Sequence, residues 1–598
     1  MSDKPWLIAA ALLIAAGLSA CGSASQNDHA YDVADETRVS IEQGDLTGVR
    51  NLENKSRAWL GIPFASPPVG DLRWRAPRPA MPFGAPLIAD TPDHACLQIN
   101  SPSILPGKAG DLVGSEDCLY LNIWAPETAS NEPLPVMVWV HGGGNATGYA
   151  GQYDYSQLTA QEDVIVVALN YRLGPMGWFS HEALRDTAET ELDESMNFGL
   201  LDLMQGLEWV QTNIAAFGGD PDKVTIFGES AGGFNISALM MAPQSEGLFD
   251  AAIIQSAGFN TYTLKEAEHG PSNEDDRRGY SSGEAISQLQ KDGSLPETAG
   301  TDSEAFSATL RSLDPEALYD AYLALLDPET GGDQINSIDN TADGVLIPIR
   351  QTDAEGHDPR ITSRDIPLLI GTNRDETRVF AMENEAFTKK KMGVLFRPID
   401  KDAYIASGEH PSRLWASLGV QQIADRRAEE LGSPTFTYRF DWDEQGSFMF
   451  SDISLLIGAV HALDVNFVSG DFRLPFLDDK AFFKEETAES RRVLSSRMMA
   501  YWASFARDFD PDVDSQPDWP AWSEGQKTLI LDSEADGGLR TQVIRETPQD
   551  IAEAFISDPR FINDAQRCEI AGVMKMIAAS QSAPTDPFTA LSERYCTS

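Results

Sequence analysis

Basic side chains are scarce in this 598-residue sequence. Lys and Arg together number 45 against 92 Asp and Glu, which gives a formal net charge of −47 at pH 7 and an isoelectric point of about 4.4. A surface so acidic repels phosphate backbones and anionic lipid headgroups. We therefore exclude nucleic-acid binding, and the charge itself supplies no attraction to a membrane.

The apolar run near the N-terminus is too short to cross a bilayer. It extends over 13 residues, from Trp6 to Leu18, whereas a spanning helix needs about 20. Lys4 precedes the run and small residues follow it, which is typical of an export signal. The tetrapeptide Leu18-Ser19-Ala20-Cys21 is similar to the lipobox of bacterial lipoproteins. We expect cleavage before Cys21 and a lipid on that cysteine.

This interpretation makes residues 1–20 a signal peptide and residues 21–37 a polar tether. Gly22 and Ser23, which follow the lipidated cysteine, favour anchoring to the bacterial outer membrane. An ordinary signal peptide, with a periplasmic or secreted product, is the alternative.

Cysteine is rare, with five residues in the chain. An odd number in an exported protein leaves one cysteine without a disulfide partner, and lipidation of Cys21 explains which one. The other four form a near pair, Cys96 with Cys118, and a C-terminal pair, Cys568 with Cys596. We expect both pairs to be bridged in an oxidising compartment; free buried thiols are the alternative.

The sequence has no internal repeat, no low-complexity tract and no metal or cofactor motif, and we expect no cofactor. Short β-rich runs alternate with glycine-rich turns and helical patterns, which predicts an α/β fold with a single large, mostly parallel sheet. Two polar, mostly helical segments, 261–341 and 378–433, are expected to be insertions that roof a pocket. The expected strands are 136–140, 164–169, 224–227, 251–255, 367–370, 435–440 and 528–531.

The strongest chemical motif is Gly228-Glu229-Ser230-Ala231-Gly232. It fits G-x-S-x-G and lies between the predicted strand 224–227 and a helical run that reaches Met241. In α/β-hydrolases such a turn presents a nucleophilic serine at the N-terminus of a helix. Backbone N–H groups and the helix dipole there favour developing negative charge. Ser230 is therefore the predicted nucleophile.

A serine nucleophile needs a base, and histidine is scarce, with eight in the chain. The chain order in α/β-hydrolases is serine, acid, histidine, which favours a late histidine such as His461. His410, beside Pro411, is its rival. The acid should follow a strand end, and strand 367–370 runs into the adjacent Asp375 and Glu376. Spacing does not choose between these two carboxylates.

A glycine run, His141-Gly142-Gly143-Gly144, follows the predicted strand 136–140 and precedes the nucleophile. Glycines let bare N–H groups approach a substrate oxygen. The run therefore predicts an oxyanion hole, with a flexible turn as the alternative.

These motifs resemble the type-B carboxylesterase family, which includes the cholinesterases, from about Val39 to Ser533. The resemblance lies in three blocks of sequence. Residues 61–74 resemble the N-terminal signature, residues 115–122 match the second signature, and residues 197–233 contain the nucleophile signature.

The resemblance implies an α/β-hydrolase domain over residues 38–598, with a helical tail from about 547. It implies Ser230 as nucleophile, His461 as base and Glu376, rather than Asp375, as acid. It also implies that the N–H groups of Gly143, Gly144 and Ala231 are the oxyanion donors.

The resemblance further implies three structural features. These are a Cys96–Cys118 disulfide, an Arg73–Glu116 salt bridge and a position of Ser256 near the triad.

The sequence departs from the family pattern at three places. Asn145 follows the glycine run where the family usually has an aromatic residue, and Thr377 follows Glu376 in place of glycine. Residues 97–117 contain no aromatic ring, so a choline cation would lack the ring faces that bind it. Acetylcholine is therefore not the expected substrate.

The expected function is hydrolysis of small carboxylic esters through an acyl-enzyme. A lipase acting on longer acyl chains and a non-enzymatic binding or adhesion module are the alternatives. The sequence leaves the oligomeric state open.

Overall fold

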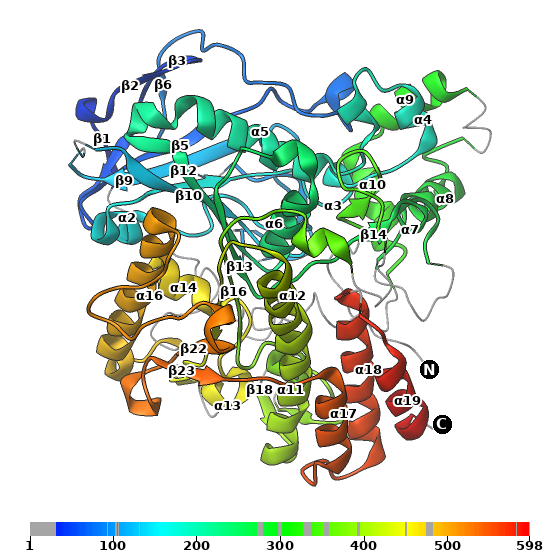
Figure 1. The fold of residues 1–598 in the computed structure, drawn as a ribbon. Helices are drawn as coiled ribbons and strands as arrows, with labels where there is room; N and C mark the ends of the chain where they lie inside the picture. Colours follow the sequence, from blue (N-terminus) through cyan, green and yellow to red (C-terminus); the bar gives the residue numbers. More distant parts are fainter. Residues whose placement is uncertain are drawn as a thin grey trace. The chain divides into compact units, whose positions relative to one another are not determined.

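The computed structural model describes residues 31–596 apart from 93, 102–103, 106, 129, 131, 272–278, 297–301, 327–336, 352–357, 392–394, 449–450, 474–481 and 582. The predicted signal peptide and Cys21 lie outside these residues. The described chain forms two compact units (Figure 1). We call residues 27–252 and 261–364 the N-terminal unit, and residues 253–260 and 365–598 the C-terminal unit.

The N-terminal unit is built on a mixed sheet. Its parallel strands β11 (Ile165–Leu169), β10 (Leu134–Val140) and β12 (Gly219–Glu229) lie side by side in that order and include three of the predicted runs. Their Val and Ile side chains and Leu169 are buried, as expected for parallel strands covered on both faces. Four further strands extend the sheet antiparallel and were not predicted: β9 (Tyr120–Pro126), β5 (Ser56–Pro63), β4 (Val49–Asn51) and β1 (Tyr31–Val33).

Residues 31–37, the end of the predicted polar tether, are part of this unit instead. Strand β1 pairs with β4, and the hydroxyl of Tyr31 donates a hydrogen bond to Asp154 over 2.7 Å. Thr37 is fully buried, and its hydroxyl oxygen accepts a hydrogen bond from the N–H of Gly48 at 2.9 Å. These contacts hold the segment in the folded domain.

Helices of the N-terminal unit follow the predicted pattern. The long helices next to the parallel strands are α5 (Phe198–Asn213) and α6 (Ala231–Met241), and α2 (Ser156–Glu162) is shorter. The segment 261–341, predicted as a helical insertion, contains α7 (Leu264–His269), α8 (Ser282–Asp292), α9 (Ser303–Arg311) and α10 (Pro315–Leu323).

The C-terminal unit has a second run of parallel strands, β16 (Leu368–Asn373), β19 (Thr435–Phe440) and β22 (Lys527–Leu531), with β23 (Arg540–Val543) antiparallel at the edge. The chain enters this unit along β13 (Ala251–Gln255), another predicted strand. The segment 378–433 contains α11 (Lys401–Ala416) and α12 (Gln422–Glu430), and also a hairpin of β17 (Thr388–Lys391) and β18 (Leu395–Pro398) that the sequence did not predict.

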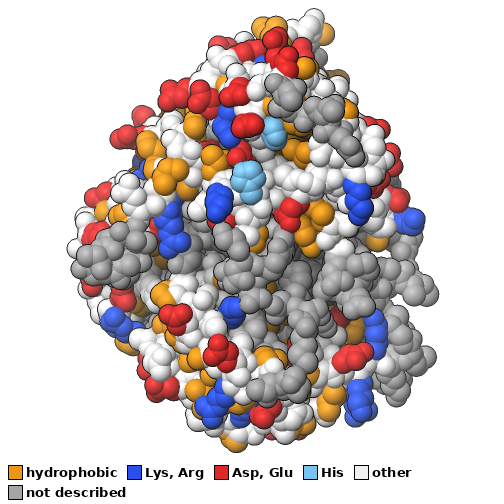
Figure 2. All heavy atoms as spheres, turned by 90° about the vertical axis from the view of Figure 1, so that its right-hand side faces the viewer, with side chains coloured by type: hydrophobic (Ala, Val, Ile, Leu, Met, Phe, Trp, Pro, Cys, Tyr) orange, Lys and Arg blue, Asp and Glu red, His pale blue; other side chains and the backbone are white. Residues whose placement is uncertain are grey.

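Further helices of this unit are α13 (Ile453–Ile457), α14 (Leu463–Ser469) and α16 (Ala488–Asp508), followed by the tail helices α17 (Pro548–Ser557), α18 (Asp564–Ser580) and α19 (Asp586–Tyr595). Helices α18 and α19 lie side by side (Figure 1). On the face drawn in Figure 2, acidic side chains gather along the upper margin, while Lys and Arg are scattered. Among the described residues, no helix is both long and apolar enough to cross a membrane.

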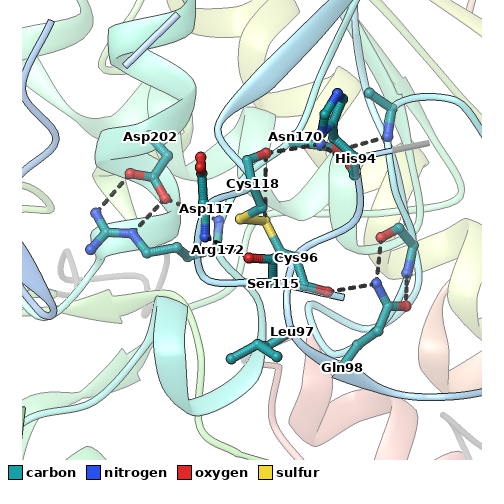
Figure 3. Close-up of a disulfide and its surroundings, with 12 residues drawn as sticks. His94, Cys96, Leu97, Gln98, Ser115, Asp117, Cys118, Asn170, Arg172 and Asp202 are labelled. Carbon is teal, nitrogen blue, oxygen red and sulfur yellow. Dashed lines mark hydrogen bonds and ion pairs between the residues drawn. A yellow bond between two sulfur atoms is a disulfide. The ribbon is translucent and has the colours of Figure 1, made fainter. Parts of the chain in front are cut away.

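Both predicted disulfides are confirmed. Cys568 is bonded to Cys596 in the tail, and Cys96 is bonded to Cys118 in the N-terminal unit (Figure 3). The backbone carbonyl of Cys96 accepts a hydrogen bond from the amide of Gln98 at 3.0 Å, and the same amide both donates to and accepts from the backbone of Gly148. The first disulfide is thus tied to the loop that follows the glycine run.

Candidate functional site

The predicted site residues are divided between the two units. Ser230 belongs to the N-terminal unit and is the single residue between strand β12 and helix α6. Its φ of 53° and ψ of −124° lie outside the regions that residues with a Cβ ordinarily occupy. Strain of this kind persists where surrounding structure enforces it, which is frequent at active sites. The turn places the serine at the N-terminal end of α6, where the helix dipole is positive.

Two glycines make this turn possible. A Cβ on Gly228 would lie 2.6 Å from the carbonyl oxygen of Val140, and one on Gly232 would lie 2.0 Å from the same oxygen. Both distances are far shorter than van der Waals contact. The motif therefore needs glycine on both sides of Ser230 because the turn packs directly against the backbone at the end of β10.

The glycine run continues from that end of β10 and passes beside the nucleophile. A Cβ on Gly142 would lie 3.2 Å from the Cβ of Ser230. Gly143 and Gly144 have φ of 99° and 63°, and the carbonyl of Gly143 accepts hydrogen bonds from the N–H groups of Ala146 and Thr147. Within the described part of the chain, the N–H groups of Gly143, Gly144 and Ala231 donate no hydrogen bond. These donors are available for a ligand oxygen.

His141, the first residue of this motif, is a structural histidine. Its ring is buried and stacks on Tyr171 with ring centroids 4.4 Å apart. Burial lowers the pKa of His141 to about 4, so the ring is neutral at pH 7. The Tyr171 hydroxyl donates to the carbonyl of His141 at 2.7 Å, which fixes the start of the glycine run.

The C-terminal unit brings Glu376 and His461 together. The Oε2 atom of Glu376 lies 2.6 Å from Nδ1 of His461, in the turn between α13 and α14. The other oxygen, Oε1, accepts hydrogen bonds from the hydroxyl of Ser256 at 2.6 Å and from the N–H of Asn373 at 2.7 Å. Glu376 is fully buried, and the His461 side chain is 14% exposed. The pair is thus a buried carboxylate that orients a partly accessible imidazole.

Asp375, the alternative acid, points elsewhere. Its carboxylate is paired with the guanidinium groups of Arg374 and Arg378 and accepts a hydrogen bond from the N–H of Ala459 at 3.0 Å. These contacts satisfy both of its oxygens without an imidazole.

His410, the alternative base, is buried within helix α11. Its Nε2 lies 2.7 Å from a carboxylate oxygen of Asp558, and its ring packs against Phe555. Burial lowers the pKa of His410 below its usual value. The side chain therefore links α11 to the tail.

Asp464, which no sequence motif marks, is a second buried carboxyl close to Glu376. Its oxygens accept hydrogen bonds from the Gln255 amide at 2.7 Å, the Tyr438 hydroxyl at 2.8 Å and the Asn373 amide at 3.3 Å. Burial raises the pKa of Asp464 above its usual value. A sequence feature that could have indicated Asp464 is its position, three residues after His461 on α14.

The described residues contain no group of His, Cys, Asp and Glu side chains that could hold a metal ion. The N-terminal unit provides a strained serine beside unpaired N–H donors. The C-terminal unit provides an imidazole held by a carboxylate. These are the parts of an acyl-transfer site.

Comparison with known proteins agrees with this chemistry. The chain matches the carboxylesterase family over residues 35–418 and 400–548. It is 34% identical to the para-nitrobenzyl esterase of Bacillus subtilis over 516 residues, which are 83% of this chain and 95% of that protein. It is 31% identical to the cocaine esterase of Oryctolagus cuniculus, over 83% and 91% of the two chains.

The fold agrees as well. A solved structure of PNB esterase superimposes with a TM-score of 0.63 at 29% identity, covering 86% of this chain and 99% of the other. This likeness confirms the predicted α/β-hydrolase fold. The chain belongs to the carboxylesterase family and is a serine carboxylic ester hydrolase.

Proposed function

We propose that Ser230, His461 and Glu376 are the catalytic triad of this esterase, with the N–H groups of Gly143, Gly144 and Ala231 as its oxyanion hole. The observation that carries the proposal is the Glu376–His461 hydrogen bond. It holds the imidazole by Nδ1 and so leaves Nε2 as the atom that takes and returns a proton.

The reaction follows from these roles. The Ser230 oxygen attacks the ester carbonyl carbon while Nε2 of His461 takes the hydroxyl proton, and Glu376 stabilises the resulting imidazolium. The carbonyl oxygen becomes an anion that the three N–H groups bind more strongly than the ground state. When the tetrahedral intermediate collapses, the alcohol leaves with the proton from His461. Water then attacks the acyl-enzyme by the same steps and releases the acid.

The proposed substrates are small carboxylic esters, with benzyl-type alcohol parts included. The named substrate of the para-nitrobenzyl esterase relative supports this class. The test series spans short and long acyl chains, because the chain-length profile separates these substrates from the longer esters of a lipase.

The test is p-nitrophenol release from acetate, butyrate, octanoate and palmitate esters by the purified protein and by Ser230→Ala. We expect activity with the shorter esters and a loss of kcat of several powers of ten in the variant. A change of less than about tenfold contradicts the assignment of Ser230. A rate that rises toward palmitate and jumps above the solubility limit of the ester indicates a lipase.

We also propose that the protein is exported and carries a lipid on Cys21 that anchors it to the bacterial outer membrane. The proposal rests on the N-terminal sequence, in which a short apolar run ends on Ser19-Ala20-Cys21.

A further inference from the structure

A pair of asparagines joins the glycine run to the nucleophile helix. Asn145 directly follows Gly144, and Asn235 lies on α6, four residues after Ala231. Each side-chain amide donates to the oxygen of the other, at 3.1 Å and 2.8 Å. Both residues are buried, with exposed fractions of 2% and 0%. The two amides therefore form a closed, buried hydrogen-bonded pair.

The pair has further partners from one distant segment. The amide of Asn145 also donates to the carboxylate of Asp339 at 2.9 Å, and the amide of Asn340 donates to the side-chain oxygen of Asn235 at 2.9 Å. Buried amides without partners are costly, whereas a connected network holds its members in one geometry. These additional bonds therefore fix the orientation of both amides.

The backbone at Asn145 is also fixed. Its φ is 54°, in the left-handed region that asparagine tolerates better than most residues. Its carbonyl accepts a hydrogen bond from the N–H of Gly174 at 2.6 Å. The loop after Gly144 thus has one anchor through the Asn145 backbone and another through its side chain.

We propose that the Asn145–Asn235 pair is a positioning device for the oxyanion hole. The inference rests on the proposed function, in which Gly143 and Gly144 supply two donors from the loop and Ala231 supplies the third from α6. The amide pair is a side-chain link between those two elements. Neither asparagine touches the substrate; each acts through the spacing of the N–H groups.

The expected effect follows from how steeply an oxyanion hole depends on geometry. A displacement of about 1 Å in a catalytic arrangement costs roughly 100-fold in rate, and loss of a whole donor costs about 100-fold to 1,000-fold. Acylation and deacylation both pass through an oxyanion, so loss of the pair lowers kcat. Because the ester is bound before charge develops, KM changes little.

The experiment uses the full chain with Asn145→Gly, Asn235→Ala and both together. Glycine at 145 removes the amide but accepts a φ of 54°, and alanine at 235 suits the helix. We expect each single variant to lose about 10-fold to 100-fold in kcat with KM within about twofold. The double variant should lose little more than the worse single variant, because the two residues act as one pair.

A matched control separates positioning from stability. Asn213 is also buried in the N-terminal unit, where its side chain bonds the N–H of Glu42 and the carbonyl of Trp209. Asn213→Ala should lower the melting temperature and leave kcat near wild type. If it lowers kcat as much as Asn145→Gly at an equal loss of melting temperature, the pair is only structural and the inference is overturned.

Inhibition by a trifluoromethyl ketone gives a second readout, because the serine adduct of this compound carries an oxyanion. Its affinity should fall in Asn145→Gly and Asn235→Ala in parallel with kcat/KM. If both asparagine variants bind the ketone and turn over ester as wild type does, while Ser230→Ala is inactive, the inference is overturned. The assignment of the catalytic triad is then unaffected. Activity in Ser230→Ala contradicts the proposed function itself.

Discussion

At the scale of single residues, two neighbouring carboxylates have different surroundings. Glu376 has neutral donors on one oxygen, the Ser256 hydroxyl and the Asn373 N–H, and the imidazole of His461 on the other. Asp375 is instead neutralised by arginines. An acid without an arginine partner can stabilise the imidazolium that forms during the reaction, whereas a carboxylate already paired with arginine stabilises that charge much less.

Exchange of each carboxylate for its amide tests this difference. Glu376→Gln should lower kcat by about 1,000-fold to 10,000-fold, because the amide no longer holds the required tautomer of His461. Asp375→Asn should leave Arg378 buried without its counter-charge and cost about 3 kcal/mol of stability, with a much smaller loss of kcat. Steady-state kinetics and thermal unfolding of both variants measure the two effects. The reverse order of kcat losses would make Asp375 the acid.

Residues that act through local geometry could be predicted from sequence, and residues that act through distant partners could not. The strand, the two glycines and the helix that position Ser230 are contiguous, so the motif is readable. His461 is 85 residues from Glu376, and only the family resemblance chose between the two carboxylates. Asn145 departs from the family pattern, but its partner Asn235, 90 residues away, leaves no local signal.

At the scale of elements, the same distinction separates the strands that were predicted from those that were not. Parallel strands such as β10 and β11 are buried on both faces and appear as continuous apolar runs. The missed strands are short, as β1 and β4 are, or interrupted, as β5 is by Arg57 and Gly61. Such strands form because a neighbouring strand pairs with them, which the sequence of one strand does not reveal.

The tail disulfide provides a prediction at this scale. Helix α18 is held by hydrogen bonds from Gln566 to the Ala386 carbonyl and from Asn384 to Glu569. Helix α19 has ten residues, too few to be stable alone. Replacing Cys568 and Cys596 with serine should cost about 3 kcal/mol, which is roughly 100-fold in opening. Hydrogen exchange in α19 should therefore accelerate far more than in α18.

The control for this experiment is the other disulfide. Serine at Cys96 and Cys118 breaks a bridge in the N-terminal unit and should leave exchange in α19 unchanged. Equal acceleration in α18 and α19 of the tail variant would show that the bridge stabilises the whole tail and not α19 in particular.

At the scale of the whole molecule, net charge and anchoring act in opposite directions. A chain with a formal charge of −47 is repelled by anionic headgroups within a Debye length of about 8 Å at physiological ionic strength. No helix among the described residues can span a bilayer. The lipid proposed on Cys21 therefore has to hold the protein at the membrane against the repulsion between its negative charge and anionic headgroups.

That dependence makes Cys21→Ser the decisive variant. When the protein is expressed in a bacterium supplied with labelled palmitate, we expect label on the wild-type chain and none on Cys21→Ser. Wild-type protein should stay with the membranes through a wash at high salt, because salt screens charges but does not weaken burial of an acyl chain. The variant should retain esterase activity, since Cys21 precedes the folded domain. Equal labelling of both chains, or release of the wild type by salt, would contradict the lipid anchor.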